Sequence, residues 1–174
     1  MDQRTRGNVI ALLFSVALPV SNATAQEKQH VSFKGAPEST QYTQQHVIDV
    51  GDVPGHQVRL FEIHRTFPTN PPTINGLKLT ESWTRATSDY IDNNGSATNY
   101  IVYVLENGDK FFARMSLVAQ SVGPGKLMNM VVGPITGGTG KLAGIQGIVR
   151  SAGTAEPKAG VNENQTDIEY WIAN

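Results

Sequence analysis

The clearest pattern in this chain is a series of short segments in which apolar and polar residues alternate, separated by turn residues. The segment Gln57–Thr66 shows it best, and a repeat of two residues is typical of a strand with one buried face. No stretch beyond residue 43 has the periodicity of an amphipathic helix. The pattern predicts eight strands, namely His46–Val50, Gln57–Thr66, Leu77–Ile91, Thr98–Leu105, Lys110–Ala119, Lys126–Thr136, Gly147–Ala152 and Thr166–Ile172.

The turns between these segments predict hairpins. Asn107-Gly108 is a favoured two-residue hairpin connection, and the stretch Asp92 to Gly95 has a similar composition. Strands in hairpin succession form antiparallel sheets, whose open edges must be kept from pairing with other chains. An eight-stranded antiparallel barrel and a two-sheet sandwich both satisfy this condition, and the periodicity leaves the two open.

The first residues predict a secretory signal peptide. Arg4 and Arg6 precede the apolar run Val9–Val20, and Ala23-Thr24-Ala25 fits a cleavage site before Gln26. A membrane anchor is the alternative, but a span needs roughly twenty apolar residues, and this run is shorter. We therefore expect an exported protein, periplasmic or secreted. The expected division of the chain is a signal peptide at 1–25, a polar N-terminal arm at 26–43 and a β-barrel domain at 44–174.

Composition narrows the classes of partner. The chain has 174 residues, which suits one domain, and it has no cysteine, so that domain is held together without disulfides. Its formal net charge is −1. A protein whose Lys and Arg residues do not outnumber its Asp and Glu residues has few free positive charges to neutralise a phosphate backbone. This argues against nucleic acid as a partner. No later segment resembles a transmembrane helix, so no membrane span is expected.

A run of glycines late in the chain carries the most specific signal. The stretch Ile135–Gly147 resembles the glycine-rich segment of the allene oxide cyclase and dirigent superfamily, and the Leu77–Leu105 hairpin has a similar layout. The resemblance implies an eight-stranded antiparallel β-barrel with an apolar central cavity, and a homo-oligomer, a dimer or a trimer. Plant members cyclise an allene oxide fatty acid or steer phenoxy-radical coupling. The catalytic Asn, Pro and Glu of the plant cyclase have no match in this chain, so the activity is not carried over.

The glycine run has a structural explanation that needs no ligand. Gly137 and Gly138 permit a tight connection, while Gly144 and Gly147 allow neighbouring strands to approach at a barrel corner. A phosphate-binding loop requires Ser or Thr after Gly-Lys, but Leu142 follows here. The run therefore predicts scaffold rather than a nucleotide site.

Two strands carry candidate chemistry. Glu62 and His64 share one strand face, and Glu81, Trp83 and Arg85 share another. If both faces turn inward, Glu62, Glu81 and Arg85 are the candidate catalytic groups for proton handling, and His64 and Trp83 are candidate ligand-binding residues. The alternative places these faces in solvent, with Phe61 and Ile63 of the Gln57–Thr66 strand in the core.

Three further residues are candidate ligand contacts. Tyr103 offers a hydroxyl at a barrel mouth, Arg114 an anchor for an anion, and Asn129 a polar group within an apolar strand. Arg114 and Asn129 could equally face solvent. The histidines are too scattered for a metal site, because Glu62 and His64 lack a third ligand, so neither a metal nor a cofactor is expected.

These observations predict an exported eight-stranded barrel that binds a small hydrophobic or aromatic molecule in its interior. If it is an enzyme, we expect a cofactor-free isomerase or cyclase. The alternatives are a non-catalytic, lipocalin-like binding protein and a structural module whose interior is packed solid.

Overall fold

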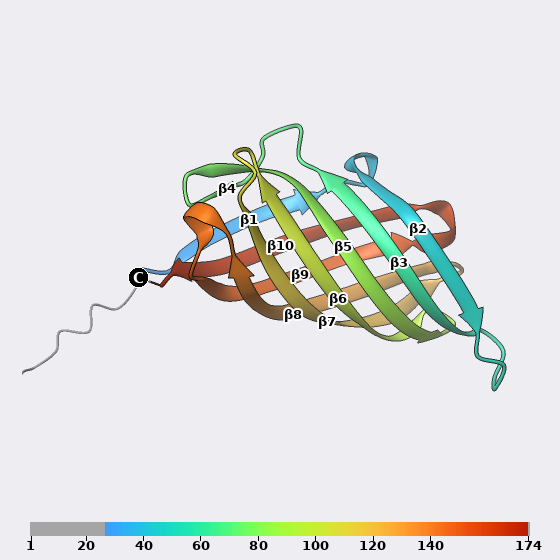
Figure 1. Cartoon of the computed structure of the whole chain (residues 1–174). Coiled ribbons are helices and arrows are strands. Elements are labelled where there is room, and N and C mark those ends of the chain that lie inside the picture. Colours follow the sequence, from blue (N-terminus) through green and yellow to red (C-terminus); the bar gives the residue numbers. More distant parts are fainter. Residues whose placement is uncertain (1–26, 174) are drawn as a thin grey trace, which may run out of the picture.

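The computed structural model describes residues 27–173, which form one antiparallel sheet with three short 3₁₀-helices (Figure 1). The strands are β1 (Gln29–Gly35), β2 (Thr40–Asp49), β3 (His56–Thr66), β4 (Thr73–Ile74), β5 (Leu77–Ile91), β6 (Asn94–Leu105), β7 (Lys110–Gly123), β8 (Lys126–Gly138), β9 (Ile145–Glu156) and β10 (Val161–Ile172). The 3₁₀-helices are η1 (Pro37–Ser39), η2 (Gly140–Leu142) and η3 (Pro157–Ala159). The expectation of an all-β, antiparallel fold is confirmed.

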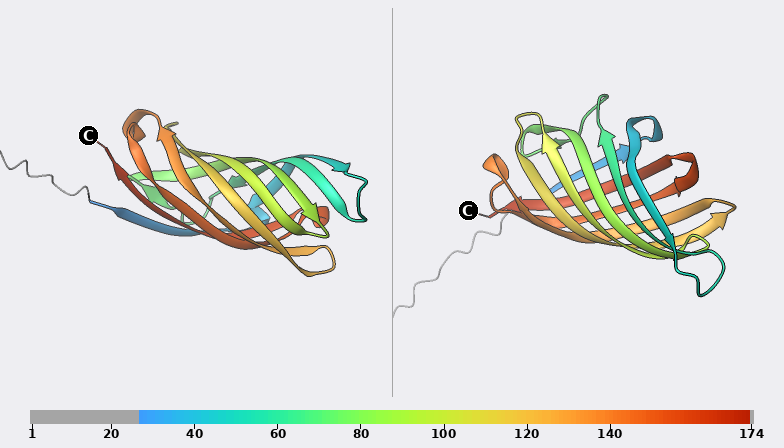
Figure 2. Two further views of the ribbon diagram at one scale, coloured as in Figure 1. Left: turned by 90° about the horizontal axis from the view of Figure 1, so that it is seen from below. Right: turned by 45° about the vertical axis from the view of Figure 1, so that its right-hand side comes forward.

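The sheet is strongly curved, so that β2 and β3 face β9 and β10 across its interior (Figures 1 and 2). Its ten strands run in the order β1-β10-β9-β8-β7-β6-β5-β3-β2, with the short β4 paired only to β5. No ladder joins the end strands β1 and β2 among the described residues, so the pairing does not confirm a closed barrel, and the count differs from the eight strands expected. We call the line where β2 lies beside β10 the seam.

The additional strands arise where the alternating pattern is weak. β1 lies inside the polar arm expected at 26–43, yet its Val31 and Phe33 pack against the core. The segment after Ala152 continues as β9 instead of forming a loop, because Gly153 to Glu156 pairs with the start of β10. The predicted signal peptide lies outside the described residues.

Both predicted hairpins are present. β6 and β7 pair through the turn at Asn107 and Gly108, where Gly108 has φ 85°. β5 and β6 meet at Asp92 and Asn93, which have φ 49° and 66°. In the turn between β5 and β6, positive φ at both central positions is the geometry that matches the twist of a hairpin, whereas in the turn between β6 and β7 only Gly108 of the Asn107-Gly108 pair has a positive φ.

One end of the curved sheet is filled by packed side chains. Leu142 of η2 and Ile74 of β4 are fully buried there, with Leu79, Leu105 and Phe111 around them. The glycine run makes this closure feasible, because a Cβ at Gly147 would lie 2.1 Å from the carbonyl oxygen of Glu169. The close backbone approach expected at this glycine is therefore confirmed.

Among residues 27–173, no helix is long and apolar enough to cross a membrane.

Candidate functional site

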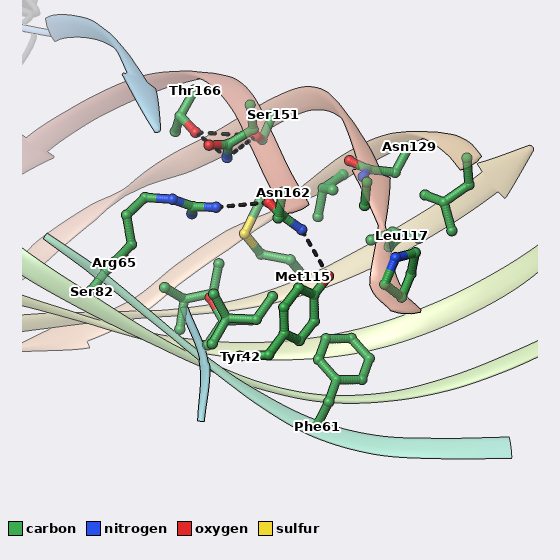
Figure 3. Close-up of a pocket in the computed structure, with 18 of the residues that line it drawn as sticks. Tyr42, Phe61, Arg65, Ser82, Met115, Leu117, Asn129, Ser151, Asn162 and Thr166 are labelled. Carbon is green, nitrogen blue, oxygen red and sulfur yellow. Dashed lines mark hydrogen bonds between the residues drawn. The ribbon is translucent and has the colours of Figure 1, made fainter. Parts of the chain in front are cut away.

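The concave face of the sheet encloses a cavity of about 90 Å³, and we call the space inside this face the lumen (Figure 3). Strands from both sides of the curved sheet line the cavity. Most of its wall is apolar or aromatic, including Phe33, Phe61, Ile63, Phe67, Ile101, Met115, Leu117 and Val131. The interior is therefore largely filled by side chains, but it is not solid.

Strand alternation decides which residues reach the lumen. On β3, Phe61, Ile63 and Arg65 line the cavity, so Glu62 and His64 between them point to the outside. On β5, a bulge between Leu79 and Glu81 changes the phase of the alternation. Ser82 and Thr84 face the lumen as a result.

Arg65 bridges the seam from inside the lumen (Figure 3). Its Nε donates to Thr40 Oγ1 of β2 at 2.9 Å, and its Nη2 donates to Asn162 Oδ1 of β10 at 2.8 Å. Asn162 Nδ2 in turn donates to the Tyr42 hydroxyl at 3.1 Å. Side-chain hydrogen bonds thus join β2 and β3 to β10 where the ladder is absent.

The lumen is electropositive. Arg59 and Arg65 both line the cavity, and no Asp, Glu or His is among its lining residues within the described chain. Arg65 is 8% exposed and forms no ion pair with residues 27–173. Burial lowers the pKa of its guanidinium, while the facing phenols of Tyr103 and Tyr42 act in the opposite direction.

Several polar groups in the lumen have no protein partner. Asn129 is 8% exposed and lines the cavity, yet its amide hydrogen-bonds to no residue within 27–173. The Nε of Arg59 is buried without a hydrogen-bond partner in this range. Buried polar groups are normally hydrogen-bonded, so Arg59 Nε is an exception, whereas the Asn129 amide borders the cavity and is open to it.

Two tyrosines add potential donors. Burial raises the pKa of Tyr90 to about 12 and raises that of Tyr103 still further. Both phenols therefore stay protonated near neutral pH. Each can donate a hydrogen bond to a ligand oxygen but is poorly suited to accept and release protons at that pH.

The lumen adjoins a wider hollow at the end opposite η2, and we call this hollow the vestibule. It has a volume of about 500 Å³ and is lined by loop residues that include Gly55, Asp92, Gly125 and Lys158. Arg59, Tyr90 and Pro157 line both spaces, so they separate the vestibule from the lumen.

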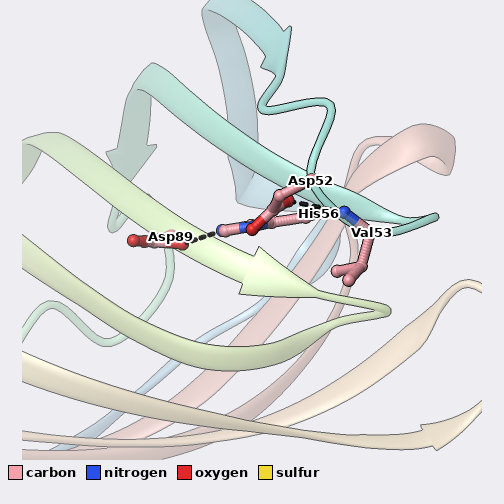
Figure 4. A network of polar contacts seen from close by, with 4 residues as sticks. All are labelled: Asp52, Val53, His56 and Asp89. Carbon is pink, nitrogen blue, oxygen red and sulfur yellow. Dashed lines mark hydrogen bonds and ion pairs between the residues drawn. The ribbon is translucent and has the colours of Figure 1, made fainter.

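A polar network holds the loop beside the vestibule (Figure 4). His56 Nε2 lies 2.7 Å from Asp89 Oδ1 of β5, and its Nδ1 lies 2.6 Å from Asp52 Oδ1. The bonds to Asp89 and then Asp52 raise the pKa of His56, and the bond to His56 lowers the pKa of Asp52. The His56 side chain therefore links the β2–β3 loop to β5 through these two contacts.

The residues expected from the sequence divide between the two faces. Tyr103 and Asn129 line the lumen. The expectation that the remaining candidates could line it is not met, because their strand faces turn outward; these are Glu62, His64, Glu81, Trp83, Arg85 and Arg114. Their proposed roles in catalysis or binding stay predictions.

The outward residues of β3 and β5 do lie together. His64 Nε2 is 2.7 Å from Glu81 Oε2, and the His64 ring stacks on Trp83 with centroids 4.0 Å apart. Arg85 Nε is 2.8 Å from Glu62 Oε2, and its guanidinium lies 5.7 Å from the Trp83 ring centroid. These cross-strand pairs satisfy one another, which is the usual structural role of such residues on a sheet.

Sequence reasoning missed the two lumenal arginines. Arg59 and Arg65 occupy the same strand face as Phe61 and Ile63, which only one of the two sequence-based alternatives placed in the core. The signal that could have identified these two arginines is a cationic residue at the same two-residue spacing as the apolar residues of a strand. Asn162 had no such signal, since it reaches the site only through the approach of β10 to β2.

No three His, Cys, Asp or Glu side chains between residues 27 and 173 are grouped so as to hold a metal ion. The lumenal groups that remain are cationic, hydroxyl and amide donors. Such groups bind the oxygen atoms of a ligand and do not attract a cation.

Comparison with known proteins assigns no family. No protein-family model and no curated protein match the chain. Among solved structures, it is similar to the pterocarpan synthase dirigent protein, with a TM-score of 0.47 and 14% sequence identity over 92% of this chain and 98% of that one. At this TM-score and sequence identity, no activity can be inferred for this chain from the similarity.

Proposed function

We propose that this protein is an exported binding protein that takes a small, largely apolar or aromatic molecule into the lumen of its curved sheet. In this proposal the seam bonds close the sheet into a barrel-like container, and the vestibule is the entrance. Export rests on the predicted signal peptide. A homo-oligomer stays a prediction.

The observation that carries the proposal is a cavity inside the curved sheet with mostly apolar walls and polar groups that lack a protein partner. Asn129 and Arg59 Nε would each gain a partner from a bound molecule. Ligand sites typically combine mostly apolar walls with a few converging polar groups in this way. A module packed for structure alone gains nothing from leaving such groups unpaired.

The volumes suggest how much of a ligand is enclosed. The cavity of about 90 Å³ is smaller than the engineered cavity of roughly 150 Å³ that holds benzene. A ring would therefore need side chains to move, or would extend past Arg59 and Tyr90 into the vestibule. We propose that a polar head group lies in the lumen and that the body of the ligand lies toward the vestibule.

Binding is favoured over catalysis in this proposal. The lining residues include no carboxylate or imidazole within the described chain, and the lumenal phenols remain protonated. General acid–base chemistry thus lacks a group poised near neutral pH. Isomerase or cyclase activity, with Glu62, Glu81 and Arg85 in catalytic roles, would have to use the outer face.

Methionine methyl groups provide the test. Met115 is 1% exposed and lines the lumen, whereas Met128 and Met130 lie on the outer face at 41% and 66% exposure. In protein labelled with ¹³C at the methionine methyls, phenol should shift the Met115 signal and leave Met128 and Met130 in place. Shifts of the outer methionines alone would refute lumenal binding. Native mass spectrometry of the purified protein would reveal a co-purified ligand.

A matched pair of variants sharpens this test. Ala155 lines the lumen and Ala152 lies exposed on the other face of β9. Ala155→Leu fills part of the cavity and should abolish the Met115 shift, while Ala152→Leu should preserve it. Both variants need a folded spectrum, since added volume can strain a core. Equal binding by both variants would contradict the proposal.

A further inference from the structure

The lumen holds a buried positive charge that no acidic side chain balances. Arg65 is 8% exposed, and its hydrogen bonds go to Thr40 and Asn162, which are both neutral. Arg59 adds a second cation to the same cavity wall. Burying an ionised group without a counter-ion is costly, so natural cores avoid it unless the charge has a use.

Bridging the seam does not account for the charge. The two bonds to Thr40 and Asn162 use one proton on Nε and one on Nη2, and a neutral amide could make similar bonds. No hydrogen bond joins Nη1 to any residue within 27–173, so guanidinium donors remain available beside the cavity. Arg65 differs from a neutral side chain in its full positive charge and in the planar, forked arrangement of its donors.

We propose that the ligand is an organic acid whose carboxylate binds in the lumen, with Arg65 as its counter-ion. This inference rests on the proposed function and specifies the substrate class of the same site. A planar carboxylate matches the two-pronged geometry of a guanidinium. Tyr103, Tyr90 and Asn129 line the same cavity and supply neutral donors for the remaining oxygen lone pairs.

The dimensions and charge favour a carboxylate over larger anions. A cavity of about 90 Å³ accommodates a head group of few atoms, while the apolar walls suit a hydrocarbon or aromatic body. Arg59 lies where the lumen meets the vestibule, so it places a second positive charge along the entry path. A charge at a mouth attracts anions from solution and raises their association rate.

Benzoate and benzamide test the inference because they have the same shape and differ in charge. Isothermal titration of the full chain should show benzoate binding about ten- to a hundredfold more tightly than benzamide. Arg65→Gln should remove that preference while leaving benzamide affinity within about twofold. Arg150→Gln, which removes an exposed arginine from the outer face of β9, should leave both affinities unchanged.

Each other outcome has a definite meaning. Equal binding of benzoate and benzamide to the wild type, or a parallel loss of both in Arg65→Gln, overturns the inference. Inorganic phosphate that displaces benzoate at concentrations below those at which benzoate binds overturns the choice of a carboxylate. If Arg65→Gln does not fold, the benzoate-to-benzamide ratio of the wild type decides by itself.

The methionine signals separate failure of this inference from failure of the proposed function. Benzamide that shifts Met115 with no advantage for benzoate refutes only the carboxylate. If neither compound nor phenol shifts Met115, the lumen is not a site for these ligands, and the proposed function fails with the inference.

Discussion

Replacing Asn129 with leucine should make the protein more stable. Asn129 lies in β8 among apolar neighbours, is 8% exposed and has no hydrogen-bond partner for its amide between residues 27 and 173. Leucine has a similar size, so Asn129→Leu removes the polar group without opening a void. A residue retained for binding rather than folding is expected to cost stability in this way.

The magnitude follows from the cost of an unpaired buried group. Leaving a buried donor or acceptor unsatisfied costs about 1–3 kcal/mol. The Asn129 amide borders the cavity and is not among the fully buried unpaired atoms, so removing it should raise the free energy of unfolding by up to about 1 kcal/mol. With a urea m-value of about 2 kcal/mol per molar, the denaturation midpoint should rise by up to about 0.5 M.

The assay is urea denaturation followed by far-ultraviolet circular dichroism, without added ligand. Asn162→Leu is the matched control, because Asn162 Oδ1 accepts a hydrogen bond from Arg65 Nη2 at 2.8 Å and its Nδ2 donates to the Tyr42 hydroxyl at 3.1 Å. That variant loses satisfied bonds and should lower the midpoint. If Asn129→Leu lowers the midpoint as well, the amide has a partner such as water, and the reasoning from an unpaired group is refuted.

Two other predictions concern the ends of the sheet. At the vestibule, the bonds to Asp89 and Asp52 raise the pKa of His56. Their contribution to stability is therefore fully present below the ordinary histidine pKa and is lost as pH rises through the raised value. An NMR titration should therefore give a lower His56 pKa in Asp89→Asn than in the wild type, and an unchanged pKa would contradict the network. At the packed end, Leu142→Ala should lower the free energy of unfolding by about 2–5 kcal/mol, because Leu142 is fully buried. Lys141→Ala, an exposed neighbour, should change it little in the same urea experiment.

The local parts of the fold were accessible from the sequence because short-range chemistry determines them. Alternation identified β3 and β5, and Asn107-Gly108 identified the hairpin between β6 and β7. β1 was missed because its Val31 and Phe33 stand among polar residues. Only pairing with β10 makes that segment a strand.

Closure was beyond local reasoning. Whether β2 pairs with β1 or lies beside β10 depends on the accumulated curvature of the whole sheet. The outcome is a seam bridged by Arg65 and Asn162, which are 97 positions apart in the chain. No spacing rule connects two such residues.

The candidate site shows the same division between local and global information. The sequence by itself determined which residues share a strand face, since alternation is a property of each extended segment. Glu62 and His64 do share a face, as do Phe61 and Arg65. Only the tertiary structure decided which face is inside, because the direction of curvature depends on packing among all the strands. That choice moved the predicted site from the carboxylates of the outer face to the buried arginine of the lumen.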